Sequence, residues 1–157
     1  MEKHEQITIA EYQLTAESYR VGTWEHDVSQ NREALIAAMS KISGKILDLG
    51  CGPGRDLVAF QAMGHEVTGL DATPAFVEMA KQVAGCPVWE QSFLSLDLPS
   101  NNFDGIFANA SLIHVPSADM LRVLQDLYDA LCDRGVLVMS MVRGNQEGFS
   151  ERPTGYR

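Results

Sequence analysis

The sequence of 157 residues predicts an α/β fold with one doubly wound, mainly parallel sheet of about five strands and helices on both faces. Two observations predict it. Short, almost wholly apolar segments alternate with longer amphipathic ones, and no internal repeat or low-complexity linker interrupts the alternation. Right-handed crossovers would place a ligand crevice at the carboxyl ends of the strands. The length suits one domain, 1–157, with one core.

The elements are expected in a regular order. Two helices come first, over 7–20 and 29–42, and Ser29 is the candidate N-cap of the second. Short apolar runs bounded by turn-forming residues predict strands over 45–49, 66–70, 87–90, 103–110 and 136–142. Further helices are expected over 54–63, 73–83 and 117–131, with Pro74 in the first turn of one and Ser117 capping another.

The charge balance limits the kinds of partner. The chain has 21 acidic and 12 basic side chains, a formal net charge of −9, and this balance repels phosphate backbones and anionic lipid surfaces. Nucleic acid is therefore not expected as a partner. No apolar run approaches the roughly 20 residues that span a bilayer, and the amino terminus lacks the apolar stretch of a signal peptide. We expect a cytoplasmic protein without a membrane partner.

The cysteines predict neither a disulfide framework nor a metal site. Cys51, Cys86 and Cys132 are widely separated, and no Cys-x-x-Cys pair is present. We expect Cys86 and Cys132 to act as small buried hydrophobic residues.

A glycine-rich turn follows the first expected strand, over 48–54. Gly50, Gly52 and Gly54 allow the backbone to pass close to a ligand, and the next helix aims its first amide groups at the same place. Dinucleotide-binding domains have a similar turn, but Arg55 fills the position that their third glycine needs. Because no Tyr-x-x-x-Lys pair is recognisable either, an NAD(P)-dependent oxidoreductase is disfavoured. Asp48, two residues before the first glycine, suits a cofactor with an amino-acid end and a cationic centre.

Two further strand ends point to the same edge of the sheet. Asp71 closes the second strand, where a carboxylate can accept hydrogen bonds from both hydroxyls of a ribose. The alternative role for Asp71 is to cap the helix that starts near Thr73. At the end of the third strand, 90–93, a polar residue can meet the edge of an adenine and Phe93 its face.

Four segments in register resemble the motifs of the class I S-adenosylmethionine-dependent methyltransferases. The segment 46–56 looks like motif I, and the later segments 64–71, 103–110 and 134–138 resemble the motifs that follow it. The likeness runs from about residue 26 to residue 142. The sequence of 109–116 is similar to that of the bacterial small-molecule enzymes of the ubiquinone/menaquinone-methyltransferase-like group.

This resemblance implies a Rossmann-like fold, S-adenosylmethionine as cofactor and methyl transfer to a small-molecule acceptor. Gly50 and Gly52 would contact the methionine portion of the cofactor, and Asp71 its ribose. Ser92 stands where the family commonly has an aspartate at the adenine. The complete set of expected cofactor-binding residues is Tyr19, Asp48, Gly50, Cys51, Gly52, Asp71, Ala72, Ser92, Phe93, Asn109 and Ala110.

His114 is the candidate catalytic base, because it lies just past the fourth strand and imidazole exchanges protons near neutral pH. The alternative is that His114 shapes the loop or contacts the cofactor carboxylate. The N-terminal region 1–28 contains Tyr12, Tyr19 and Trp24, and either forms a lid over the cofactor or packs as an amphipathic helix on the sheet.

The resemblance also implies two further strands that the sequence after residue 142 is too short to supply. The expected fifth strand then lies at a sheet edge and is rich in Val, Leu and Met, a pattern that favours pairing with another strand. A homodimer through this edge, or cover by the tail 143–157, is therefore expected. The alternative function is an S-adenosylmethionine-binding protein without turnover, or a truncated methyltransferase acting with a partner.

Overall fold

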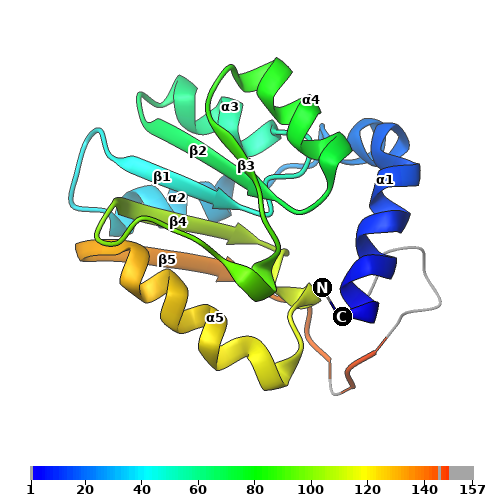
Figure 1. Ribbon diagram of the computed structural model, residues 1–157. Helices are drawn as coiled ribbons and strands as arrows, with labels where there is room; N and C mark the ends of the chain where they lie inside the picture. The colour runs from blue at the N-terminus through cyan, green and yellow to red at the C-terminus, as the bar shows by residue number, and fades with distance from the viewer. Residues whose placement is uncertain (1, 145, 149–157) are drawn as a thin grey trace.

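The computed structural model describes residues 2–144 and 146–148. Its centre is a parallel sheet with the strand order β3-β2-β1-β4-β5 (Figure 1). The strands are β1 Lys45–Leu49, β2 Glu66–Asp71, β3 Val88–Glu90, β4 Phe103–Asn109 and β5 Leu131–Ser140. The predicted α/β class and doubly wound sheet are confirmed, and β1, the first strand in the chain, lies in the middle of the sheet.

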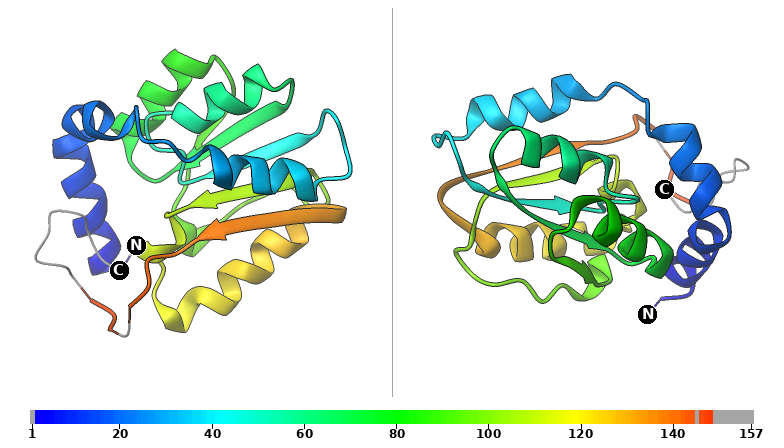
Figure 2. Two further views of the ribbon diagram at one scale, coloured as in Figure 1. Left: turned by 180° about the vertical axis from the view of Figure 1, so that it is seen from behind. Right: turned by 90° about the horizontal axis from the view of Figure 1, so that it is seen from above.

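Helices cover both faces of the sheet. They are α1 Lys3–Thr23, α2 Ser29–Ala38, α3 Arg55–Ala62, α4 Pro74–Ala84 and α5 Ser117–Ala130, with short 3₁₀ turns η1 Phe93–Ser95 and η2 Leu112–His114. Apolar residues of α2, α3 and α4 pack on one face, and those of α5 pack on the other. Figure 2 shows the sheet between these two layers, with α1 at one end of the strands, where it packs against α4. No helix of the described residues is long and apolar enough to cross a membrane.

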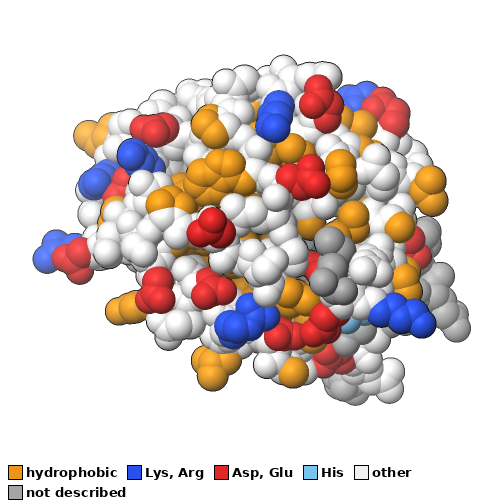
Figure 3. All heavy atoms as spheres, in the orientation of Figure 1, with side chains coloured by type: hydrophobic (Ala, Val, Ile, Leu, Met, Phe, Trp, Pro, Cys, Tyr) orange, Lys and Arg blue, Asp and Glu red, His pale blue; other side chains and the backbone are white. Residues whose placement is uncertain are grey.

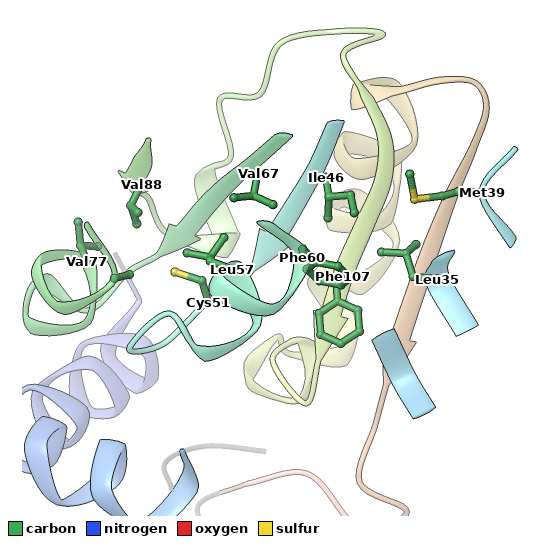
Figure 4. Packing of buried hydrophobic residues seen from close by; sticks show 11 residues of the cluster. Leu35, Met39, Ile46, Cys51, Leu57, Phe60, Val67, Val77, Val88 and Phe107 are labelled. Atoms are coloured by element: carbon green, nitrogen blue, oxygen red, sulfur yellow. The ribbon is translucent and has the colours of Figure 1, made fainter. Parts of the chain in front are cut away.

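Alternate side chains of the buried strands build the two halves of the core. Phe107 of β4 packs on the α2–α4 side, whereas its neighbour Ile106 packs on the α5 side. Phe60 and Phe107 are both fully buried and meet edge to face, with ring centroids 5.1 Å apart (Figure 4). Because both faces of the central strands are buried, these strands are apolar along most of their length.

The expected start and end of α2 are wrong. Ser29 is the first helical residue rather than the cap, and its N–H donates to Asp27 Oδ1. The helix ends at Ala38, because Met39 takes an extended conformation and turns its side chain into the core. Ile42, which fits the apolar stripe of a longer helix, is 98% exposed.

The end of α5 and the start of β5 also differ from expectation. Ser117 is the first residue of α5, Pro116 holds the cap position, and β5 begins at Leu131. Phe103 pairs with Leu131 and Gly105 with Val136, so β5 carries extra residues at this point. The extra residues form a bulge, which explains why the sequence pattern indicates a turn there.

The expected edge position of β5 is confirmed within the described part of the chain. Met139 in β5 and Val142 just beyond it are about half exposed, at 47% and 53%. Most of the expected tail, 145 and 149–157, lies outside the described residues.

Candidate functional site

The turn after β1 is held against the end of β2. The N–H groups of Gly50 and Cys51 both donate to the Leu70 carbonyl oxygen, at 2.7 and 3.0 Å. Gly50, Gly52 and Gly54 all have a positive φ, and a Cβ on Gly50 would collide with the Ser111 side chain. Glycine is therefore required where the backbone turns from β1 into α3, and the turn faces the carboxyl edge of the sheet.

Asp71 joins the two loops that leave β1 and β2. Its Oδ2 accepts the N–H of Gly52 and its Oδ1 accepts the N–H of Thr73, each at 2.9 Å. Burial raises the pKa of the Asp71 carboxyl, and the N–H donors of Thr73 and Gly52 oppose that rise. Thr73, not Asp71, holds the cap position of α4, so Asp71 stabilises the turn before the helix rather than capping the helix. A carboxylate has about four acceptor sites, so each oxygen keeps capacity for a ligand hydroxyl.

Asp48 lies beneath the glycine turn and is 2% exposed. Its Oδ2 has no hydrogen-bond partner among the described residues. Burial raises the pKa of the Asp48 carboxyl well above its usual range, and the charges of Asp56 and Asp71 raise it further. Arg55 and Arg32 act in the opposite direction on the same pKa. Both arginines are themselves ion-paired with Asp56, at 2.9 and 2.6 Å.

Asn109, the last residue of β4, has a fixed amide orientation. Its Oδ1 accepts from Asn31 Nδ2 at 2.9 Å and from the Ser140 hydroxyl at 2.8 Å. The Ser140 hydroxyl oxygen accepts the N–H of Ala110. The Ser140 hydroxyl proton is therefore the one donated to Asn109 Oδ1. With the carbonyl side held by two donors, the amide NH₂ of Asn109 is left to serve as a donor in the adjacent cavity.

A cavity of about 100 Å³ lies between this edge and α1, which stands across the ends of the strands in Figure 1. His114 Nε2 lies 3.1 Å from the Tyr12 hydroxyl of α1, and the Tyr12 ring also packs against Tyr19 and Phe76. The lining residues are Glu5, Thr8, Ile9, Tyr12, Tyr19, Gly50, Gly52, Asp71, Ala72, Thr73, Phe76, Phe93, Leu94, Asn109, Ala110, Ser111 and His114.

Most residues expected at the cofactor therefore line one cavity, but three do not. Asp48 is beneath the turn, and Cys51 packs its thiol in the core beside Leu57 (Figure 4). Ser92 does not line the cavity, and its hydroxyl donates to Oε1 of Glu5, which does. Within the described residues, no group of three or more His, Cys, Asp or Glu side chains could hold a metal ion.

The sequence indicates only part of the contribution of α1. Glu5, Thr8 and Ile9 are site residues that sequence reasoning missed, although they fall at helical spacing from Tyr12 and so share one face of α1. That spacing is the signal that could have found them, but the mixed charge of the first residues obscures it.

A family model described as a methyltransferase domain matches residues 46–135, more than half of the chain. The chain belongs to this methyltransferase family. The matched range runs from β1 into β5 and contains the glycine turn, Asp71 and Asn109.

A curated relative is named as a methyltransferase, and two solved structures share the fold. Trans-aconitate 2-methyltransferase of Paracidovorax citrulli is 31% identical over 119 residues, which are 73% of this chain and 45% of that protein. The chain thus spans less than half the length of that relative. The structure of 1,6-didemethyltoxoflavin-N1-methyltransferase of Burkholderia thailandensis, with 1,6-didemethyltoxoflavin and S-adenosylhomocysteine bound, superimposes with a TM-score of 0.73 at 22% identity, over 91% of this chain and 64% of that one. The structure of the [4+2]-cyclase SpnF superimposes with a TM-score of 0.76 at 20% identity, over 98% of this chain and 66% of that one.

The cofactor of this methyltransferase family is S-adenosylmethionine, and the residues present fit it. At Gly50 and Gly52 the turn presents backbone without a side chain to the cavity, so a ligand can approach the backbone there. Acceptor capacity remains on Asp71, and a donor is available on Asn109. The cavity wall thus offers acceptors for ribose hydroxyls and a donor for a carboxylate.

Replacement of Asp71 by Ala is expected to weaken S-adenosylhomocysteine binding by at least about 10-fold, because hydrogen bonds to a charged acceptor are lost. Isothermal titration calorimetry measures the affinity, and far-UV circular dichroism checks that the variant is folded. Asp133→Ala, at an exposed carboxylate in β5, is the matched control. An unchanged affinity in Asp71→Ala would refute the ribose assignment.

Replacement of Asp48 by Asn is expected to stabilise the fold at neutral pH. Burial raises the folded-state pKa of Asp48, so the wild-type protein loses stability as pH rises through the interval between the unfolded and the folded pKa. Urea unfolding should therefore give the Asp48→Asn variant no advantage near pH 4, about the unfolded pKa, and a growing advantage toward pH 7. Asp133→Asn should show no such trend, and a pH-independent difference for Asp48→Asn would contradict the argument.

Proposed function

We propose that the protein transfers the methyl group of S-adenosylmethionine to a small-molecule acceptor. The observation that carries the proposal is one cavity that brings the glycine turn, Asp71, Asn109 and His114 together at the carboxyl edge of the sheet. The matching family model supports the same reaction class.

The proposed cofactor orientation follows the order of the strands. The methionine portion lies over the turn at Gly50 and Gly52, and its carboxylate accepts from the Asn109 amide. Ala110 and Tyr19 flank that portion, and Asp71 accepts from the ribose hydroxyls. The adenosine then passes Ala72 and reaches Phe93 at the end of β3. Asp48 and Cys51 act from beneath, through the shape and charge of the turn.

When bound, the cofactor supplies an electrophilic methyl group on a sulfonium. The protein aligns an acceptor atom with the methyl group, excludes water and receives the acceptor's proton. His114 is the proposed proton acceptor, and Tyr12 holds its ring through the 3.1 Å contact at Nε2. Carboxylate acceptors need no base, whereas a hydroxyl or a ring N–H acceptor does.

The region 1–28 is the proposed lid. The cavity of about 100 Å³ is smaller than the roughly 300 Å³ at which ligand pockets begin, and one side of it is formed by α1. Movement of α1 away from the strand ends enlarges it. The aromatic contacts of Tyr12 and Tyr19 with Phe76 of α4 then re-form over the bound cofactor.

A non-catalytic cofactor-binding protein, or a truncated methyltransferase acting with a partner, is the second candidate. Its support is that the chain matches under half the length of its relative.

Methyl transfer is tested with methyl-labelled cofactor and an acceptor panel that starts from trans-aconitate and from N-heterocycles. We expect acceptor-dependent formation of S-adenosylhomocysteine. For a hydroxyl or N–H acceptor, His114→Ala should lower kcat by about 10²-fold or more, because general-base catalysis contributes that much, with less effect on cofactor binding. Tyr128→Phe, at an exposed tyrosine in α5, is the control. Cofactor binding with no transfer to any acceptor would favour the second candidate.

We also propose a homodimer through the edge of β5, in the cytoplasm. The half-exposed Met139 and Val142 support an edge that another strand can cover, and the free cysteines suit a reducing compartment. Light scattering should give twice the chain mass, and Met139→Lys should shift it toward the monomer, because a charge on an edge opposes pairing. A monodisperse wild-type monomer would contradict the dimer.

A further inference from the structure

The first turn of α1 is joined to the end of β3 by one hydrogen bond between residues far apart in the sequence. The hydroxyl of Ser92 donates to Glu5 Oε1. The Ser92 oxygen also accepts the N–H of Leu94 at 3.0 Å, so its single proton is committed to Glu5. The Glu5 carboxylate is therefore held at one place and in one orientation at the edge of the cavity.

The second oxygen of this carboxylate has no partner. Glu5 lines the cavity, and its Oε2 is buried with no hydrogen bond among the described residues. A buried acceptor left unpaired is costly, and a ligand that brings an N–H group would remove that cost. The neighbouring Phe93 and Leu94 offer apolar surface. Together these residues form a recess of the cavity with apolar surface and one strong acceptor, which suits an aromatic base that carries an amino group.

The position of the recess identifies the part of the ligand that enters it. The strand order places β3 directly outside β2, and Asp71 at the end of β2 is the proposed ribose contact. A nucleoside whose ribose is at Asp71 and whose 5′ substituent runs toward β1 and β4 has its base toward β3. The base thus reaches Phe93 and Glu5.

We propose that Glu5 accepts a hydrogen bond from the 6-amino group of the adenine and thereby selects adenine over 6-oxopurines. The inference rests on the proposed cofactor and adds a specificity residue from outside the matched range 46–135. Ser92 acts as a positioning residue, because it holds the carboxylate and contributes no charge of its own. A 6-oxo group would place a carbonyl oxygen against the Glu5 carboxylate, where both groups are acceptors.

The test compares the affinities for S-adenosylhomocysteine and S-inosylhomocysteine, which differ in the 6-substituent and the adjacent ring proton. Calorimetry should show the wild type preferring the adenine compound by about 10- to 100-fold, the effect of one hydrogen bond to a charged group. Glu5→Ala should abolish this preference while binding both compounds. Glu2→Ala, at the exposed side chain just before the helix, should leave it intact. In Glu5→Ala, the additional change Ser92→Asp returns a carboxylate to the recess and should restore the preference.

Two results would overturn the inference, and they are distinguishable. If Glu5→Ala binds S-adenosylhomocysteine and keeps the full wild-type preference, Glu5 does not select the base, although the proposed cofactor stands. If the folded wild type binds neither compound, the proposed cofactor site fails and the inference fails with it. Circular dichroism confirms folding in each case, and the ratio of two affinities within one variant is insensitive to a uniform loss of binding.

Discussion

The site depends on the hydrogen bonds that tie the turn after β1 to the end of β2. Asp71 holds Gly52 and Thr73 through its two oxygens, and the Leu70 carbonyl holds Gly50 and Cys51. These bonds fix the positive-φ glycines above a parallel sheet whose strands all end at this edge. Asn109 from β4 and Phe93 beyond β3 then meet the same cavity, because parallel strands end at one edge of the sheet.

Three acidic side chains gather at this edge, where the burial of a carboxylate has a cost in free energy. In the described part of the chain, one buried oxygen of Asp48 has no partner, Asp71 relies on backbone donors, and Asp56 pairs with two arginines. An arrangement optimised for stability alone would not gather three carboxylates around one turn. For Asp71, which lines the cavity, part of this cost is offset where a ligand brings hydroxyl groups to the carboxylate.

The sequence was sufficient for features that rest on repeated local patterns. Apolar runs predict the five strands, and Gly50, Gly52 and Asp71 indicate the shared edge from their positions at strand ends alone. It failed where one long-range contact decides the outcome. Ile42 continues the helical stripe of α2, but burial of Met39 ends that helix earlier. Glu5 lies in a charged segment without a motif, and only the packing of α1 across the sheet brings it to Ser92.

The surface agrees with the acidic composition. On the face drawn in Figure 3, acidic and basic side chains are interspersed and no continuous basic stripe is present among the described residues. The charge of −9 is therefore not opposed on that face by a local basic field that would attract a polyanion.

A single helix touches both ends of the cavity. Glu5 and Tyr12 are seven residues apart in α1, about 10 Å along its axis, and they contact Ser92 beyond β3 and His114 beyond β4. A rigid helix cannot release one of these contacts far without disturbing the other. Admission of the nucleoside and access of the acceptor are therefore expected to share one motion, because a displacement of α1 that separates Glu5 from Ser92 also separates Tyr12 from His114.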